Sequence, residues 1–180
     1  GTADQSVTLL RSAYSWAISE GLLADNPAAG VKVAQSGQRE TILGGSDDYA
    51  QLFRVLTQME NELRIRRPAA DAIRLIALTG ARRGEAAGLK WRYVDLRTGQ
   101  IALPPTAHKA GGRTGKPRII GLPAEAQAII ARQPGGEADD FVFKPAKGAG
   151  PLSLAKPWQQ VRTEAGLPEN LGLHGLRHSL

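Results

Sequence analysis

The first apolar pattern along the chain has helical spacing. From Ser6 to Glu20, apolar residues return every three or four positions, which predicts an amphipathic helix that ends at Gly21. Because a single helix cannot bury its own apolar face, we interpret residues 1–33 as the last helix of a preceding domain. Residues 34–40 are polar and lack periodicity, and we interpret them as a linker.

The remaining residues, 41–180, predict a domain built mostly from helices. Ser46 is expected to cap a helix with one apolar face. Pro68 is expected to begin a nearly all-apolar, buried helix that ends at Gly80, after which a short helix restarts in the stretch ARRGEAAGLKW. Further helices are expected from Pro123 to about Arg132, from Ser153 to Gly166, and from about His174 onward.

Between these helices the apolar pattern changes to that of short strands. The stretch VDLRTGQIALP, residues 94–104, holds two extended runs around Thr98 and Gly99, which is a hairpin signal. A third strand is expected in KPRIIGLP, residues 116–123, with a glycine-rich mobile loop or hairpin tip at 105–115. The predicted fold class is therefore mostly α with a small antiparallel β-sheet (α+β).

Composition narrows the function classes. A formal net charge of +6 and a pI of about 10.0 favour an anionic partner, of which nucleic acid is the commonest. The absence of cysteine from the sequence excludes disulfides and thiolate chemistry. No apolar run approaches the roughly 20 residues that span a bilayer, and Gly1–Leu10 lack the pattern of a signal peptide, so neither membrane insertion nor export is expected.

The first candidate motif is TGARRGEAAGLKW. It sets Arg82 and Arg83 at a helix start, where backbone N–H groups and the helix dipole also favour anions. Arginine is permanently charged and binds two phosphate oxygens at once. Glu85, in the first turn, is expected to hold one of the two arginines in position. Taken alone, the motif is more typical of a solvated arginine pair with a glutamate favoured by the helix dipole.

The second candidate motif is HKAGGRTGKPR, which places a group of basic side chains on a glycine-rich stretch. A lysine on such a stretch can protonate a leaving oxygen if neighbouring cations lower its pKa. The alternative is a basic surface loop that touches phosphate nonspecifically. The basic residues are Lys109, Arg113, Lys116 and Arg118, with His108 beside them.

The third candidate motif is HGLRH. His174 and Arg177 are three residues apart, so a helix would put them on one face. His178 lies four residues from His174, which is the spacing of a metal-binding pair. A zinc site needs a third ligand, and His108 is the only other histidine, so neither a metal nor another cofactor is expected. Together the three motifs predict a cationic cage for a phosphate whose charge grows in the transition state.

These motifs also carry a family resemblance. LTGARRGEAAGLKWRYVD is similar to the first arginine box of the tyrosine recombinases, the phage integrase family. HKAGGRTGKPRIIGLP resembles that family's lysine-bearing hairpin, and LHGLRH its H-x-x-R box, in which an acidic residue more often fills the place of Gly175. The resemblance spans about Arg39 to the end, with the preceding helix similar to the end of the family's core-binding domain. It implies an integrase-type DNA breaking–rejoining catalytic domain over 41–180.

The resemblance implies a role for each matching residue. Arg82 and Arg177 would be the catalytic arginines and His174 the box histidine, with Arg82 preferred to Arg83 because it follows the T-G-x turn directly. Lys109 would be the general acid, with Lys116 as the alternative. His178 is assigned to packing or hydrogen bonding. Contacts to DNA outside the reacting centre are expected from Arg83, Arg113, Lys116 and Arg118.

The family's nucleophile is a tyrosine that lies well after the H-x-x-R box. Tyr14, Tyr49 and Tyr93 all precede that box, so none matches the position. We therefore expect a chain that ends before its nucleophile and is inactive alone. The complete protein would cleave and rejoin DNA through a 3′-phosphotyrosyl link, freeing a 5′-hydroxyl.

The resemblance also implies partners and location. Double-stranded DNA is the expected substrate, bound by a homotetramer on two DNA sites, with no membrane association and a cytoplasmic, nucleoid-associated location. Two alternatives stay open, a DNA-binding module without chemistry and a type IB topoisomerase-like enzyme. The four-residue cage argues against the first, and the helix before Arg39 argues against the second.

Overall fold

The computed structural model describes residues 2–33 and 43–177, so the predicted linker at 34–40 lies outside its described part. The chain divides into two compact units, Gly1–Glu40 and Thr41–Leu180. In the first unit, helix α1 (Thr2–Ser19) ends where Gly21 takes a left-handed φ of 70°. The segment after it folds back along the helix, with Arg11 Nε donating to the Ala28 carbonyl at 2.9 Å. Leu9 and Trp16 stay exposed, as expected for a helix that lacks a large packing partner within its unit.

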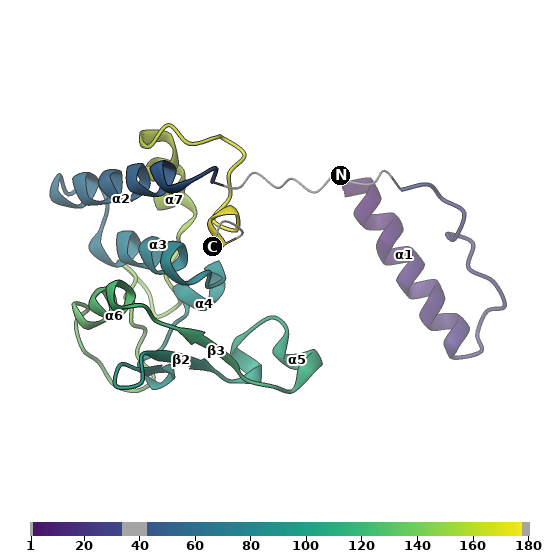
Figure 1. The fold of residues 1–180 in the computed structure, drawn as a ribbon. Helices are drawn as coiled ribbons and strands as arrows, with labels where there is room; N and C mark the ends of the chain where they lie inside the picture. Colours follow the sequence, from purple (N-terminus) through teal and green to yellow (C-terminus); the bar gives the residue numbers. More distant parts are fainter. Residues whose placement is uncertain (1, 34–42, 178–180) are drawn as a thin grey trace. The chain divides into compact units, whose positions relative to one another are not determined.

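The second unit is organised around one buried helix, α3 (Arg67–Thr79). Helices α2 (Ser46–Asn61), α6 (Ala124–Ala131) and α7 (Ala155–Glu164) all contact α3, and Figure 1 shows α2 and α6 on either side of it. The predicted apolar helix after Pro68 is confirmed, since every residue from Ala69 to Ala77 is buried. Gly80 ends it in a left-handed conformation with φ 62°, a conformation that glycine adopts without strain.

The predicted small sheet is also confirmed. Strands β1 (Val94–Asp95), β2 (Gln100–Leu103) and β3 (Arg118–Gly121) pair antiparallel in that order. Ile101 lies opposite Val94 on one side and Ile120 on the other, and it is buried with Leu103. The fold is thus mostly helical with a three-stranded antiparallel sheet (Figure 1).

Both predicted serine caps are wrong. Gly45, not Ser46, occupies the cap position of α2, and Asp48 instead accepts the Gly44 amide at 2.8 Å. At α7 the cap position falls on Leu154, one residue after Ser153, without a side-chain cap bond. Leu154 is only 2% exposed, so burial of this side chain, not hydroxyl capping, fixes where the chain enters α7.

The glycine-rich stretch between β2 and β3 is not an irregular loop. It holds a 3₁₀ turn, η2 (Pro105–Ala107), and a one-turn helix, α5 (Gly111–Thr114), which contact each other. A Cβ at Gly111 would overlap the Pro105 carbonyl, so only glycine allows this approach. Phe141 forms one antiparallel bridge to Lys90, the residue just before the 3₁₀ turn η1 (Trp91–Tyr93). Across the described helices, none combines the length and apolarity needed to cross a bilayer.

Candidate functional site

The candidate site begins at the turn between α3 and α4 (Arg83–Ala87), where Arg82 is the cap residue. The Arg82 guanidinium donates from Nη1 to Glu85 Oε1 at 2.8 Å. The Arg82 backbone N–H donates to the other carboxylate oxygen, Oε2, also at 2.8 Å. The expectation that Glu85 holds one of the two arginines is therefore confirmed, and the arginine is Arg82. Arg83, the next residue, is exposed.

The same carboxylate faces a second arginine, from the sheet. Arg118 Nε, at the start of β3, lies 3.5 Å from Glu85 Oε2. The Glu85 side chain is only 3% exposed, whereas Arg82 and Arg118 are 30% and 24% exposed. One buried carboxylate thus holds two arginines from different elements and leaves part of each guanidinium accessible. Since two positive charges meet one negative charge, this cluster, Arg82–Glu85–Arg118, keeps a net positive charge.

The Arg118 guanidinium has spare hydrogen-bonding capacity. Its Nε is buried, yet among the described residues it makes no hydrogen bond, because 3.5 Å to the carboxylate is too long. Since this Nε has no accessible surface, an incoming anion would meet the exposed quarter of the Arg118 side chain and not this N–H. The sequence motifs did not reveal the pairing of Arg118 with Glu85, because the two residues meet only when β3 packs beside α4.

The basic connection between β2 and β3 projects from the same end of the sheet as Arg118. Arg118 pairs in register with Leu103, the last residue of β2, so the connection that joins them starts beside the arginine cluster. His108 Nε2 lies 3.0 Å from the Lys116 carbonyl and ties the two ends of this connection together. The connection carries three exposed cations, Lys109, Arg113 and Lys116. No described contact joins either lysine to Arg82, so the choice between them as general acid stays a prediction.

The backbone of residues 174–177 of the HGLRH motif lies at the same end of α3 as Arg82. The structure gives one 3₁₀ turn here, η3 (Gly175–Arg177), and it contacts α3. The Tyr49 hydroxyl donates to the Leu176 carbonyl at 2.7 Å and lines a cavity with Ala77 and Leu78, near the C-terminal end of α3.

A second contact fixes the chain before this turn. The Trp158 indole N–H donates to the Leu171 carbonyl at 3.0 Å. His174 is exposed. The Arg177 side chain and all of His178 lie outside the described part of the chain, so the predicted sharing of one pocket by Arg82 and Arg177 stays a prediction. Within the described residues, no group of three potential metal-binding His, Cys, Asp or Glu side chains lies together.

The three tyrosines have different surroundings. Tyr49 uses its hydroxyl to hold the Leu176 carbonyl, which is a structural role. Tyr14 lies on α1 in the first unit, and Tyr93 lies in η1, packed in part against the core.

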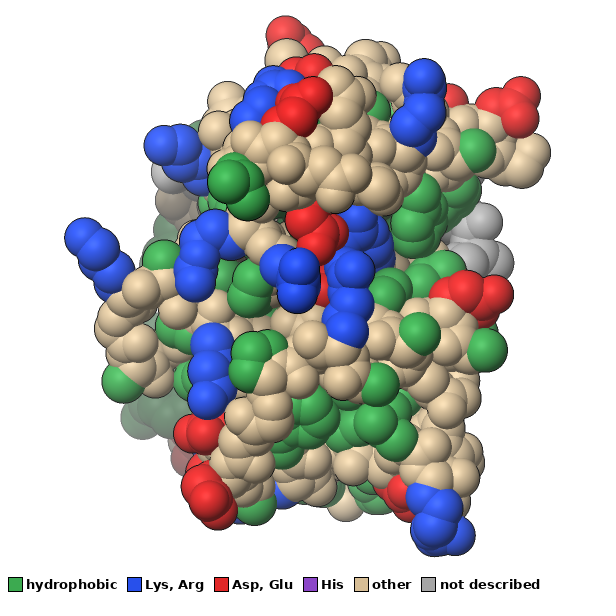
Figure 2. Space-filling view, turned by 90° about the vertical axis from the view of Figure 1, so that its left-hand side faces the viewer, with side chains coloured by type: hydrophobic (Ala, Val, Ile, Leu, Met, Phe, Trp, Pro, Cys, Tyr) green, Lys and Arg blue, Asp and Glu red, His purple; other side chains and the backbone are tan. Residues whose placement is uncertain are grey.

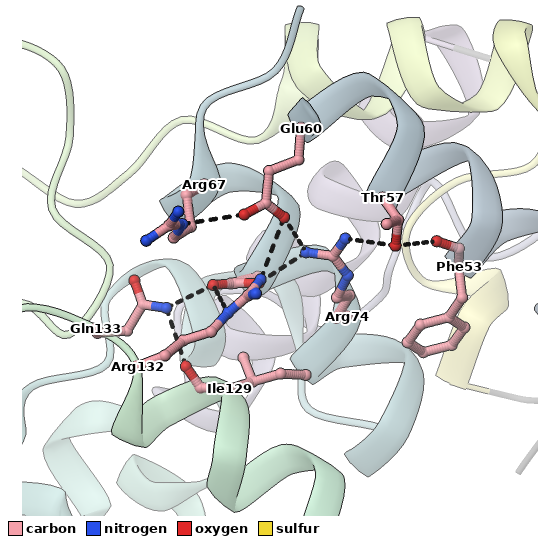
Figure 3. Close-up of polar contacts among 9 residues, drawn as sticks. Phe53, Thr57, Glu60, Arg67, Arg74, Ile129, Arg132 and Gln133 are labelled. Atoms are coloured by element: carbon pink, nitrogen blue, oxygen red, sulfur yellow. Dashed lines mark hydrogen bonds and ion pairs between the residues drawn. The ribbon is translucent and has the colours of Figure 1, made fainter. Parts of the chain in front are cut away.

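A second charged cluster, which the sequence motifs did not indicate, lies near the other end of α3 (Figure 3). Asp71 is fully buried and accepts hydrogen bonds from Arg74 Nη1 and Arg132 Nε, both at 2.8 Å, and from Gln133 Nε2 at 2.6 Å. Glu60 of α2 accepts from Arg74 Nη1 at 2.7 Å and from Arg132 Nη2 at 3.2 Å. This network joins α2, α3 and the end of α6. Near the middle of the face drawn in Figure 2, Lys and Arg side chains gather around carboxylates.

The charges of this network shift the pKa of Glu60. Burial raises the pKa of this carboxyl, but the hydrogen bond and charge of Arg74 and the charge of Arg132 outweigh burial and leave the pKa below its usual value of 4.5. The Asp71 hydrogen bond likewise raises the pKa of Arg132. Glu60 and Arg132 are therefore charged near neutral pH, and every guanidinium in the network is already bound to a carboxylate of the protein. It is suited to holding helices together and not to binding a further anion.

Solved structures define the class of fold. The Tn1549 transposon integrase, in a complex with circular intermediate DNA, matches with a TM-score of 0.65 at 17% identity, over 97% of this chain and 63% of that chain. The XerA recombinase matches with a TM-score of 0.58 at 16% identity, over 94% of this chain and 57% of that chain. The domain therefore has the fold of the integrase and recombinase catalytic domains.

Sequence comparison gives the family. Residues 46–180 match the model of the phage integrase family, and the chain belongs to that family. Tyrosine recombinase XerC of Xanthomonas campestris is 27% identical over 175 residues, which cover 94% of this chain and 51% of the relative. XerC of Proteus mirabilis is 28% identical, over 94% of this chain and 54% of the relative. The chain thus spans about half the length of these curated relatives.

Proposed function

We propose that this chain is part of a site-specific tyrosine recombinase that integrates or exchanges DNA. Residues 41–180 would be the catalytic domain without its C-terminal segment, and residues 1–33 the end of the core-binding domain, joined through a linker at 34–40. The substrate would be double-stranded DNA, bound by a homotetramer on two sites. Family membership, the integrase fold and the net charge of +6 support this proposal.

The observation that carries the proposal is the buried Glu85 carboxylate with its two arginines. A guanidinium fixed before substrate arrives needs no reorganisation when negative charge develops on a phosphate. Glu85 fixes Arg82 through two hydrogen bonds of 2.8 Å, one from its guanidinium and one from its backbone N–H, and the Arg82 side chain stays 30% exposed. A cluster with net positive charge and two partly exposed arginine side chains is suited to bind a phosphodiester.

Within this proposal, Arg82 and Arg177 stabilise the equatorial phosphate oxygens, and His174 hydrogen-bonds to one of them. Lys109 on the basic connection gives a proton to the departing 5′-oxygen, with Lys116 as the alternative donor. Arg83, Arg113, Lys116 and Arg118 contact the DNA backbone. The nucleophilic tyrosine is supplied by a segment outside the 180 residues, and its oxygen becomes linked to the 3′-phosphate as the 5′-hydroxyl leaves. A 5′-hydroxyl of the partner strand then reverses the step. Because the nucleophile comes from a segment outside the 180 residues, the 180-residue chain alone would be inactive.

The test is a covalent adduct assay on the protein of the complete reading frame, with nicked DNA that traps the 3′-phosphotyrosyl link. We expect an adduct with the complete protein and none with the 180-residue chain. Arg82→Ala should reduce the adduct rate by about 10²-fold or more, as loss of a group that stabilises transition-state charge does. Arg97→Ala, an exposed arginine at the opposite end of the sheet, should not change the rate. DNA binding without any adduct from the complete protein would instead indicate a DNA-binding module without chemistry.

A further inference from the structure

A groove lies at the opposite end of α3 from Arg82. It has a volume of about 380 Å³ and lies between the turn that joins α2 to α3 and the start of α7. Its wall at the α2–α3 turn lies roughly 20 Å along α3 from the end that leads to Arg82, because α3 has 13 residues and a helix rises about 1.5 Å per residue. On its other wall, the Leu152 backbone N–H donates to the Ala87 carbonyl of α4 at 3.2 Å. The inference drawn from this groove does not depend on the proposed function.

The groove has an apolar floor. Ile65 and Ala69 line it and are nearly buried, with Leu152 and three prolines, Pro145, Pro151 and Pro157, around them. A concave apolar surface of this volume is large enough to take a leucine or phenylalanine side chain. Phosphate and sugar groups would leave such a floor unfilled, which favours a peptide over a DNA backbone as the occupant.

The rim of the groove is basic. Arg66, Lys147 and Lys156 line it, and no ion pair or hydrogen bond of the described residues engages their side chains. Arg64 also lines the groove, but it is paired with Glu164 at 2.5 Å and with Glu62 at 3.1 Å. No Asp or Glu is among the residues that line the groove. Three cations thus face one hollow without an anion of the protein, which is complementary to an acidic partner.

An unusual residue stands beside this groove. Leu63, which directly precedes Arg64, is 91% exposed and has a left-handed backbone with φ 56°. It occupies the turn position after α2 at which glycine is usual, and a side chain there costs about 1 kcal/mol. The exposed Leu63 side chain contributes no burial to the fold, and it directly precedes Arg64 of the groove, so it is available to a partner bound there.

From these observations we propose that the groove, together with Leu63, binds an acidic peptide segment of a partner protein that inserts one large apolar side chain. The apolar side chain fills the floor over Ile65 and Ala69. The acidic residues on either side pair with Arg66, Lys147 and Lys156. Because none of the residues that line the groove belongs to the Arg82–Glu85–Arg118 cluster, such a partner binds without competing for that cluster.

The test is selection of a displayed library of random short peptides on the immobilised 180-residue chain, followed by affinity measurements on the selected peptides. We expect enrichment of Asp and Glu around one Leu, Phe, Ile or Trp. The Lys147→Glu/Lys156→Glu variant should bind these peptides about tenfold more weakly or worse, because two attractions become repulsions. Arg97→Glu, at an exposed position on the sheet, makes the same kind of charge change and should leave the affinity unchanged.

Leu63→Gly gives a second variant that keeps the fold, since glycine adopts the left-handed conformation freely. It should weaken peptide binding by about tenfold through the lost apolar contact. The proposal is overturned if the selected peptides carry no acidic bias, or if the lysine double variant binds them as tightly as the unmodified chain. It is also overturned if duplex DNA displaces the peptides and loses affinity in the same variant, because the groove would then be a DNA contact.

Discussion

Replacing Asp71 by Asn should destabilise the catalytic unit strongly, although Asp71 lies near the opposite end of α3 from the arginine cluster. The Asp71 side chain is fully buried and accepts hydrogen bonds from Arg74, Arg132 and Gln133. An Asn side chain has nearly the same shape, but it removes the negative charge and turns an NH₂ donor toward guanidinium donors. Arg74, whose side chain is 8% exposed, then keeps its charge with only Glu60 to balance it.

The magnitude follows from the burial. Removing one partner of a buried ion pair costs about 3–5 kcal/mol, because the remaining charge is left uncompensated. Glu60 lies 2.7 Å from Arg74 and 3.2 Å from Arg132 and offsets part of that loss. We therefore expect the free energy of unfolding to fall by about 3 kcal/mol, at the lower end of that range. The loss should persist at high salt, since buried pairs are poorly screened.

The assay is urea unfolding at neutral pH, followed by tryptophan fluorescence in a Trp16→Phe background, so that the signal comes from Trp91 and the buried Trp158 of this unit. Asp139→Asn is the matched control, since Asp139 also pairs with two cations, Lys90 and Arg92, but its side chain is 64% exposed. That variant should lose no more than about 1 kcal/mol. If Asp71→Asn loses as little as the control at an unchanged m-value, the network does not hold the three helices together and the reasoning is refuted.

Three further predictions use the same contacts. Because the folded-state pKa of Glu60 is lowered from 4.5, the charged carboxylate contributes its full stability above the unfolded-state pKa and loses it as pH falls through the folded-state pKa. The difference in unfolding free energy between the unmodified chain and Glu60→Gln should therefore shrink below about pH 4.5. A difference independent of pH would contradict this assignment. The 180-residue chain should bind duplex DNA with an affinity that falls steeply as salt rises. Arg113→Ala and Lys116→Ala should each reduce the slope of log K against log salt by about 1, whereas Arg97→Ala should leave the slope unchanged. Equal slopes in all variants would exclude the basic connection from the DNA contact. Gly111→Ala should displace the turn between η2 and α5, because its Cβ overlaps the Pro105 carbonyl. It should therefore weaken DNA binding more than Gly112→Ala, whose Cβ meets open space. Equal DNA affinities for the two variants would show that the shape of this connection is unimportant for DNA binding.

The sequence was sufficient for the main elements because their patterns are local. The apolar run after Pro68, the hairpin signal at Gly99 and the extended run at Ile119 and Ile120 each predicted the observed helix or strand. The caps at Ser46 and Ser153 were predicted wrongly, because neighbouring contacts of Asp48 and burial of Leu154 outweighed hydroxyl capping.

The charged clusters could not be predicted in this way, since their partners come from distant elements. Asp71 stood in a stretch interpreted as almost wholly apolar, and only the packing of α2 and α6 against α3 surrounds it with Glu60, Arg74 and Arg132. Glu85 was expected to hold an arginine one turn away, whereas its approach to Arg118 depends on the position of β3. The roles given to Lys109, His174 and Arg177 rest on the family resemblance and stay predictions.

The two clusters near opposite ends of α3 show what separates a binding site from a structural clamp built of the same residue types. In the Asp71 network, the buried Asp71 and the partly buried Glu60 accept hydrogen bonds from Arg74 and Arg132, so the strongest anion partners of these cations are already in place. In the Arg82–Glu85–Arg118 cluster, one carboxylate faces two arginines, and the buried Nε of one of them has no acceptor. An added phosphate would have to displace a carboxylate from the first cluster, at the cost of a buried ion pair, but it completes the second. Arg82 is therefore poised for an anion because Glu85 positions it without neutralising the site.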